Sequence, residues 1–169
     1  MKTTNEQGRI QLPPSLGLRI WDELKEKHGI EPRKNAMGLM DFSFSQEEIG
    51  LITKLKVHNP VRGNLQGISK LYNLQNLIIT SDQAGDYTKD NMICTITDQE
   101  MDEIGQVRSL RSLSVSNQHD IWGIDLSRLE NLEFLSITHC LQLEQVDGID
   151  GLSKLFGLTC YGNRTLMRN

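Results

Sequence analysis

The chain has 169 residues and a formal net charge of −4, with acidic and basic side chains interspersed along its length. This length predicts one domain, and the lack of a basic stripe argues against a nucleic-acid partner. The apolar stretches are far shorter than the roughly 20 residues of a membrane-spanning helix, so no membrane partner is expected.

The amino-terminal residues 1–8 lack the apolar run of a secretory signal, which predicts a cytoplasmic protein if the native chain begins here. The cysteines stand at positions 94, 140 and 160, with no C-x-x-C spacing. Neither a disulfide framework nor a zinc site is therefore expected. No cofactor is predicted, because no Gly-rich phosphate loop or metal-binding motif appears in the sequence.

Residues 1–44 are predicted to form a polar lead-in followed by a capping helix. Residues 1–14 end in two prolines and are expected to be frayed. A helix is predicted over 16–28, because apolar side chains recur on one face between a candidate N-cap at Ser15 and a terminating Gly29. Its apolar face is expected to cover the end of the core built by the residues that follow; docking in a partner's groove is the alternative.

A short apolar segment separates this helix from the rest of the chain. Met37, Leu39 and Met40 are expected to be buried. The alternation of Phe42 and Phe44 predicts a short extended piece.

An apolar sequence motif recurs through residues 45–169 and is the most informative pattern in the chain. It reads Leu-x-x-Leu-x-x-Leu-x-Ile or a close variant, and its third leucine recurs at intervals of 22, 36, 22 and 23 residues. Such a period indicates a solenoid in which each repeat contributes one short strand. The long interval holds an insert near 83–95. The strands are predicted at 55–57, 77–79, 113–115, 135–137 and 158–160, each opened by a structural leucine: Leu55, Leu77, Leu113, Leu135 and Leu158.

Two helix-start patterns lie within this region. Ser45 and Thr97 are each followed by acidic residues, and Glu stands three residues after each of them. A capping side chain with acidic residues in the first turn favours a helix N-terminus. Some repeats are therefore expected to return through a helical turn, and others through tighter irregular segments.

The motif resembles the leucine-rich repeat, whose consensus is L-x-x-L-x-L-x-x-N/C-x-L. The best match to this consensus lies at residues 132–140. The resemblance covers about residues 45–163. It implies an α/β repeat solenoid, specifically a leucine-rich repeat horseshoe with a concave parallel β-sheet of about five strands and an N-terminal helical cap.

The resemblance also assigns structural roles at the Asn/Cys site of the consensus, which holds Cys140 and Asn163 in this chain. In the family this side chain turns inward and bonds main-chain groups of the loop that would otherwise lack partners. Pro60, Asp82 and Gln118 occupy the same offset in the other repeats and depart from the consensus.

No set of acid, base and nucleophile converges in the sequence, so the chain is predicted not to be an enzyme. The most suggestive pair is His139 beside Cys140. Adjacent residues of a strand point to opposite faces, and a nucleophile needs its base within hydrogen-bond reach. A buried cysteine is therefore favoured over a reactive thiol.

The outward strand positions predict a binding face. Short hydroxyl side chains form its floor, basic residues lie on the first strand and aromatic residues cluster at the last ones. Solvation alone is the alternative explanation for the hydroxyls, but exposed aromatic residues are typical interface anchors. The acidic insert is expected to enlarge the face, because loops on rigid scaffolds often carry function. The predicted partner-binding residues are Phe134, Phe156, Tyr161, Tyr87, Lys56, His58, Ile78, Asp86 and Asp90.

These features predict a non-catalytic protein–protein binding module. The resemblance implies an inhibitor, an adaptor or a toxin-neutralising immunity protein that grips a protein partner, and the acidic balance of the chain suits a basic one. The alternative is a recognition or scaffolding subunit of a larger assembly that self-associates through its C-terminal repeat, for example as a homodimer. An enzyme is the third and disfavoured class.

Overall fold

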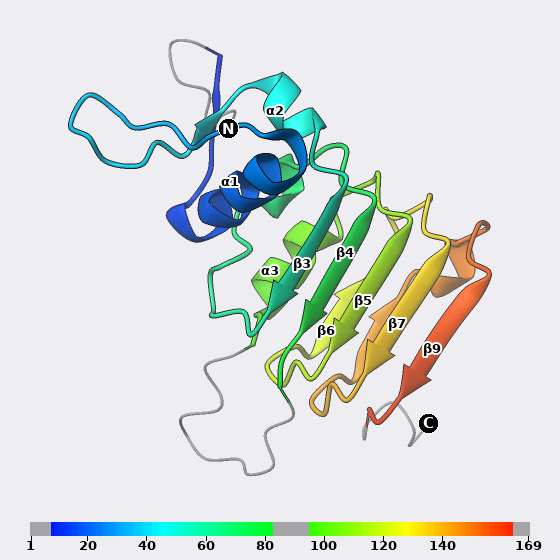
Figure 1. The fold of residues 1–169 in the computed structure, drawn as a ribbon. Coiled ribbons are helices and arrows are strands. Elements are labelled where there is room, and N and C mark those ends of the chain that lie inside the picture. Colours follow the sequence, from blue (N-terminus) through cyan, green and yellow to red (C-terminus); the bar gives the residue numbers. More distant parts are fainter. Residues whose placement is uncertain (1–7, 83–94, 164–169) are drawn as a thin grey trace.

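The computed structural model describes residues 8–82 and 95–163 and shows an α/β protein built on a five-stranded parallel sheet (Figure 1). The sheet order is β3, β4, β5, β7, β9, so each of these strands pairs with the next one along the chain. The predicted strands and their parallel pairing are confirmed, and each is one residue longer at both ends. Their bounds are β3 Lys54–His58, β4 Asn76–Thr80, β5 Ser112–Ser116, β7 Phe134–Thr138 and β9 Gly157–Tyr161.

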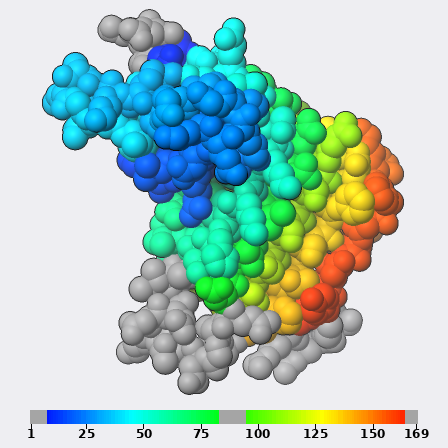
Figure 2. Space-filling model, viewed as in Figure 1, coloured from blue at the N-terminus to red at the C-terminus, as the bar shows by residue number. Residues whose placement is uncertain are grey.

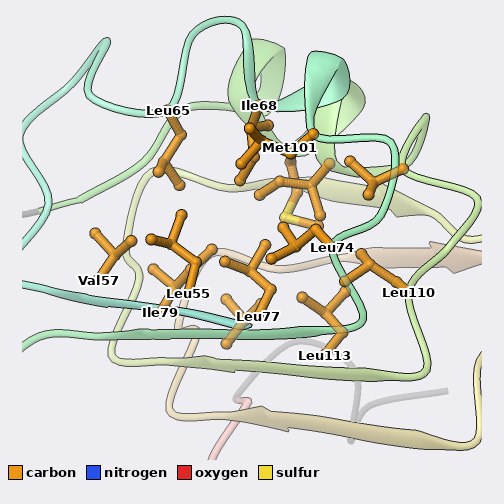
Figure 3. Close-up of a cluster of buried hydrophobic side chains, with 14 of the residues drawn as sticks. Leu55, Val57, Leu65, Ile68, Leu74, Leu77, Ile79, Met101, Leu110 and Leu113 are labelled. Atoms are coloured by element: carbon orange, nitrogen blue, oxygen red, sulfur yellow. The ribbon is translucent and has the colours of Figure 1, made fainter. Parts of the chain in front are cut away.

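The register of the sheet stacks the opening leucines of the repeats in one row. Leu55 pairs with Leu77, which pairs with Leu113, and the row continues through Leu135 to Leu158. The first four are buried in one continuous core. Figure 3 shows part of this core, in which leucines of the sheet meet apolar side chains of the returning segments.

The last leucine of this row, Leu158, is not buried as expected. Leu158 is 54% exposed, whereas Leu135, its partner on β7, is 2% exposed. Cys160, two residues further on the same face of β9, is also exposed. The sequence pattern tells which face a side chain occupies, but β9 is the final strand, and no further repeat stacks against it in the described residues.

Short elements cover the inner face of the sheet. Helix α3 packs against the short strand β6 and the 3-10 turn η1, and β6 pairs in parallel with β8. This layer lies behind the sheet in Figure 1. The bounds are η1 Ile68–Lys70, α3 Asp98–Ile104, β6 Gly123–Asp125, β8 Gln145–Asp147 and η3 Ile149–Gly151.

Both predicted helix starts are present. Ser45 caps α2, Gln46–Gly50, and Thr97 caps α3, each through its side-chain oxygen and the main-chain N–H three residues later. In both helices the side chain of the Glu at that third position accepts a hydrogen bond from the N-cap main-chain N–H. These reciprocal bonds satisfy two donors that a helix N-terminus leaves without partners.

Helix α1, Pro14–His28, lies next to β3 at the first edge of the sheet (Figure 1). Its buried side chains belong to the same core as the leucines of the strands. The helix ends at Gly29 as predicted, in a left-handed conformation with φ 66°. The predicted cap at Ser15 is wrong: Pro13 occupies the N-cap position, and Pro14 begins the helix, where its missing N–H costs nothing.

The lead-in before α1 is more ordered than expected. Strand β1, Ile10–Gln11, pairs antiparallel with β2, Ser43–Phe44, and Ile10 and Leu12 are buried. The expectation of a frayed segment is therefore wrong for residues 10–12. The predicted extended piece at Phe44 is confirmed as β2.

The expectation of burial is also wrong for the apolar residues before β2. Met37 is 79% exposed, and Leu39 and Met40 are exposed as well. They belong to a hairpin loop closed by a bridge between Lys34 and Met40. Within this loop the Asn35 side chain accepts hydrogen bonds from two main-chain N–H groups, so the turn is formed by local bonds and its apolar side chains face outward.

Among the described residues, no helix combines the length and apolar character needed to cross a lipid bilayer.

Candidate functional site

The outward face of the sheet is formed by alternate side chains of its five strands, opposite the buried leucines. In Figure 2 this face is open along the strands from β3 to β9. We call it the outward face. It consists of Lys54, Lys56, His58, Asn76, Ile78, Thr80, Ser112, Ser114, Ser116, Phe134, Ser136, Thr138, Gly157, Thr159 and Tyr161.

The β3 end of the outward face is basic. Lys54, Lys56 and His58 are exposed there, and no carboxylate occupies any outward position of the five strands. His58 Nε2 lies 3.3 Å from Oδ1 of Asp82, which follows β4. The face therefore carries positive charge, although the whole chain has a net charge of −4.

The middle of the outward face is uncharged. Its surface on β4, β5 and β7 consists mainly of short hydroxyl side chains, which are half-buried between neighbouring strands except for Thr138, which is buried. Ser116 Oγ donates to Thr80 Oγ1 at 2.9 Å, so some hydroxyls bond across strands. Ile78 is half-buried within this surface.

An exposed aromatic pair lies at the far end of the outward face. Phe134 begins β7 and Phe156 immediately precedes β9; they are 46% and 72% exposed. Their ring centroids are 4.3 Å apart at an interplanar angle of 64°. The Phe134 ring lies over Gly157, where an added Cβ would stand 2.4 Å from Phe134 Cδ1. The absence of a side chain at Gly157 thus leaves the space that the ring occupies.

Tyr161 does not join this pair. It pairs with Thr138, four residues along β7 from Phe134, which corresponds to about 13 Å of extended chain. Its ring packs instead against His139, with centroids 5.1 Å apart. The predicted single cluster of three aromatic residues is therefore two separate groups.

Three of the predicted partner-binding residues, Tyr87, Asp86 and Asp90, lie outside the described residues, as does most of the predicted insert. Lys56, His58, Ile78, Phe134 and Tyr161 occupy the outward face, and Phe156 lies at its border.

Cys140 is a buried structural residue in the loop after β7. Its main-chain N–H donates to Oδ1 of Asn163 at 2.8 Å, and its Sγ lies 3.6 Å from the carbonyl oxygen of Thr138. Burial raises the pKa of its thiol to about 11. The ring of His139 packs on Tyr161 and so is not directed to this thiol as a base.

Gln118 is a structural residue that the comparison with the consensus treated as a departure. Its side chain is fully buried; Nε2 donates to Ser81 Oγ at 2.9 Å and to the Ser116 carbonyl at 3.0 Å, and Oε1 accepts from the Ile96 N–H at 2.9 Å. It therefore links main-chain groups as Asn163 does. The available signal was position: Gln118 stands five residues after Leu113, as Cys140 does after Leu135.

A shallow hollow of about 260 Å³ lies on the opposite side of the molecule, between α3 and β6. Asp125 at this hollow accepts the main-chain N–H of Ser127 at 2.9 Å, which lowers the pKa of its carboxyl group. In the two described ranges, no group of three or more His, Cys, Asp or Glu side chains is placed to hold a metal ion. The hollow is lined by Asp102, Gly105, Gln106, Asp125 and Arg128.

No protein-family model matches the chain, and no curated protein matches it in sequence.

Proposed function

We propose that the chain is a leucine-rich-repeat-like solenoid and that it is a non-catalytic module that binds a protein through its outward face. Two features support the solenoid: each copy of the apolar motif contributes one strand, and consecutive strands pair in parallel and in register. The inward-turned side chains of Cys140, Asn163 and Gln118 bond or lie against main-chain groups of the neighbouring loops, as the Asn/Cys site of such repeats would.

The exposed Phe134–Phe156 pair is the observation that carries the binding function. Large aromatic side chains cost free energy in water because they leave apolar area exposed. Here the two rings are in contact with each other, and one of them lies over a glycine of a regular sheet. Aromatic anchors held on a rigid surface are typical of the residues that contribute most to protein–protein affinity.

The charge of the outward face indicates the kind of partner surface that it fits. The net charge of the chain suggested a basic partner, but the face itself carries Lys54 and Lys56 and no carboxylate. A complementary partner surface is acidic opposite β3 and apolar opposite Phe134 and Phe156. An inhibitor or immunity protein whose target has such a patch is one form of this proposal.

The size of the sheet sets a further requirement. Five strands span about 19 Å and five residues about 17 Å, whereas a standard interface takes about 800 Å² from each partner. The flat area of roughly 320 Å² is therefore too small by itself. Residues at its border, such as Phe156, must contribute.

The test is a comparative co-purification from the cells that produce the protein. The double variant Phe134→Ser and Phe156→Ser is compared with wild type and with Trp122→Ser, a matched control. Trp122 is a half-exposed aromatic residue next to β6, in the layer behind the sheet. We expect a protein that is recovered with wild type and with the control and lost with the double variant. Equal recovery with all three chains, at equal melting temperatures, would contradict binding through the outward face.

A further inference from the structure

The two edges of the sheet differ in the features that keep edge strands from pairing with other chains. At β3, exposed Lys54 and Lys56 alternate along the strand, and α1 lies next to it (Figure 1). At β9, the nine residues 155–163 contain no charged side chain and no proline. Charge, proline and a covering element are the usual protections of an edge strand, and β9 has none of them among the described residues.

The inner face of β9 is also incompletely covered. Leu158 and Cys160 are exposed, although Leu135 and Ile137, with which they pair on β7, are buried. Leu155, just before β9, is half-buried. In the part of the chain that the structure describes, the apolar row of the core thus continues to β9, where its last side chains are exposed.

The main-chain groups of β9 that face away from the sheet can be identified. The Gly157 N–H donates to the Glu133 carbonyl at 3.1 Å, and the Tyr161 carbonyl accepts from the His139 N–H at 3.0 Å, so both residues bond toward β7. Successive residues of a strand direct their main-chain groups to opposite sides. Leu158 and Cys160 therefore direct their N–H and C=O groups outward from the edge.

We propose that β9 is a self-association edge, at which a second copy of this chain pairs antiparallel to β9 about a two-fold axis at Thr159. In this register Leu158 stands opposite the partner's Cys160, and Cys160 opposite the partner's Leu158. Each of these is a hydrogen-bonded pair that exchanges two main-chain bonds. The arrangement is closed, because the same surface is used by both copies, and it forms one continuous ten-stranded sheet.

A second copy fits this edge better than a charged strand for three reasons. Residues 155–163 carry no charge that would repel an identical segment. The exposed apolar residues Leu158 and Cys160 of the inner face meet their counterparts and leave water. On the outward face, Gly157 stands opposite the partner's Tyr161, and the Phe134 ring that lies over this glycine is placed to meet that tyrosine ring. The dimer presents both outward faces on the same side.

Sedimentation velocity of the 169-residue chain, from micromolar to millimolar concentration, tests the dimer. Thr159→Lys places two like charges opposite each other at the axis and is expected to weaken association at least about tenfold. Ser114→Lys is the matched control. Ser114 pairs with Ser136, which pairs with Thr159, so it occupies the same strand position on β5, away from the edge. A monomer throughout, or a dimer that Thr159→Lys leaves unchanged, would overturn the inference.

Disulfide trapping tests the register, in chains that carry Cys94→Ser. In Leu158→Cys the Cα atom of residue 158 lies about 5.5 Å from the Cα atom of the partner's Cys160. This distance is within the range that a disulfide can bridge. In the chain without this substitution, Cys160 and the partner's Cys160 are diagonal neighbours about 7–8 Å apart. Rapid oxidation to a covalent dimer is therefore expected for Leu158→Cys alone. Equally rapid cross-linking of both chains, or of neither, would refute the register.

Discussion

Asn163 and Cys140 are joined by a buried hydrogen bond between neighbouring repeats. Oδ1 of Asn163 accepts the main-chain N–H of Cys140 at 2.8 Å, while its Nδ2 donates to the carbonyl oxygen of Ile137 at 2.9 Å. The Asn163 side chain is almost fully buried. One amide group thus satisfies a donor and an acceptor that water does not reach.

Replacing Asn163 with leucine is expected to lower the free energy of unfolding by about 1–3 kcal/mol, because two buried main-chain groups lose their partner. Asn131→Leu is the control. Its Nδ2 also bonds a main-chain carbonyl, that of Arg108 at 3.0 Å, but at an exposed site where water can replace it. Chemical denaturation measures both changes, and equal losses would contradict the structural role of Asn163.

Leu135 and Leu158 occupy the same position in adjacent repeats but differ in burial. Leu135→Ala is expected to cost roughly 2–5 kcal/mol through lost transfer free energy and the cavity left behind. Leu158→Ala should cost much less in the monomer, because half of its side chain already faces solvent. Thermal or chemical denaturation at low protein concentration distinguishes them. Two similar losses would mean that β9 is as well covered as β7.

The strands could be predicted from the sequence because the repeated motif determines which side chains point inward. The motif places Leu158 on the inner face of the sheet, but it does not show whether another layer covers that face. The exposure of Leu158 was therefore missed. The split between Phe134 and Tyr161 was missed because the prediction grouped the aromatic residues by neighbouring strand, although these two residues lie at opposite ends of the paired strands β7 and β9.

The pairing of β1 with β2 could not be predicted, because two-residue strands have no periodicity. Their partner segments are also more than 30 residues apart in sequence. Gln118 was misjudged because the consensus names Asn and Cys, while the amide chemistry that matters is shared by the longer side chain.

The thiols of Cys140 and Cys160 should differ in reactivity. The thiolate is the reactive form, and burial raises the pKa of Cys140 to about 11, so little of it is ionised at pH 8. Cys160 is exposed. Mass spectrometry of the native chain after brief alkylation at pH 8, at a low protein concentration that keeps it monomeric, is expected to show modification of Cys160 well before Cys140. Labelling of Cys140 should rise as the pH approaches 11, and faster labelling of Cys140 at pH 8 would show that it is accessible.

Gly157 should position Phe134. A methyl group at Gly157 would overlap the Phe134 ring, so Gly157→Ala is expected to displace the ring from the sheet and from Phe156. Aromatic NMR cross-peaks between the two rings, present in the wild type, should weaken or disappear. Gly123→Ala is the control, because no atom lies within 4 Å of its added Cβ. Unchanged ring contacts in Gly157→Ala would show that the ring does not depend on the glycine.

Photo-crosslinking at two positions tests the proposed binding face most directly. The photoreactive residue p-benzoylphenylalanine replaces either Ser136, in the middle of β7 on the outward face, or Gln106, at the hollow between α3 and β6. After illumination of cells that produce the protein, we predict a covalent adduct with another protein from position 136 and none from position 106. An adduct from position 106 alone would contradict the account and place the interface on the opposite side of the molecule.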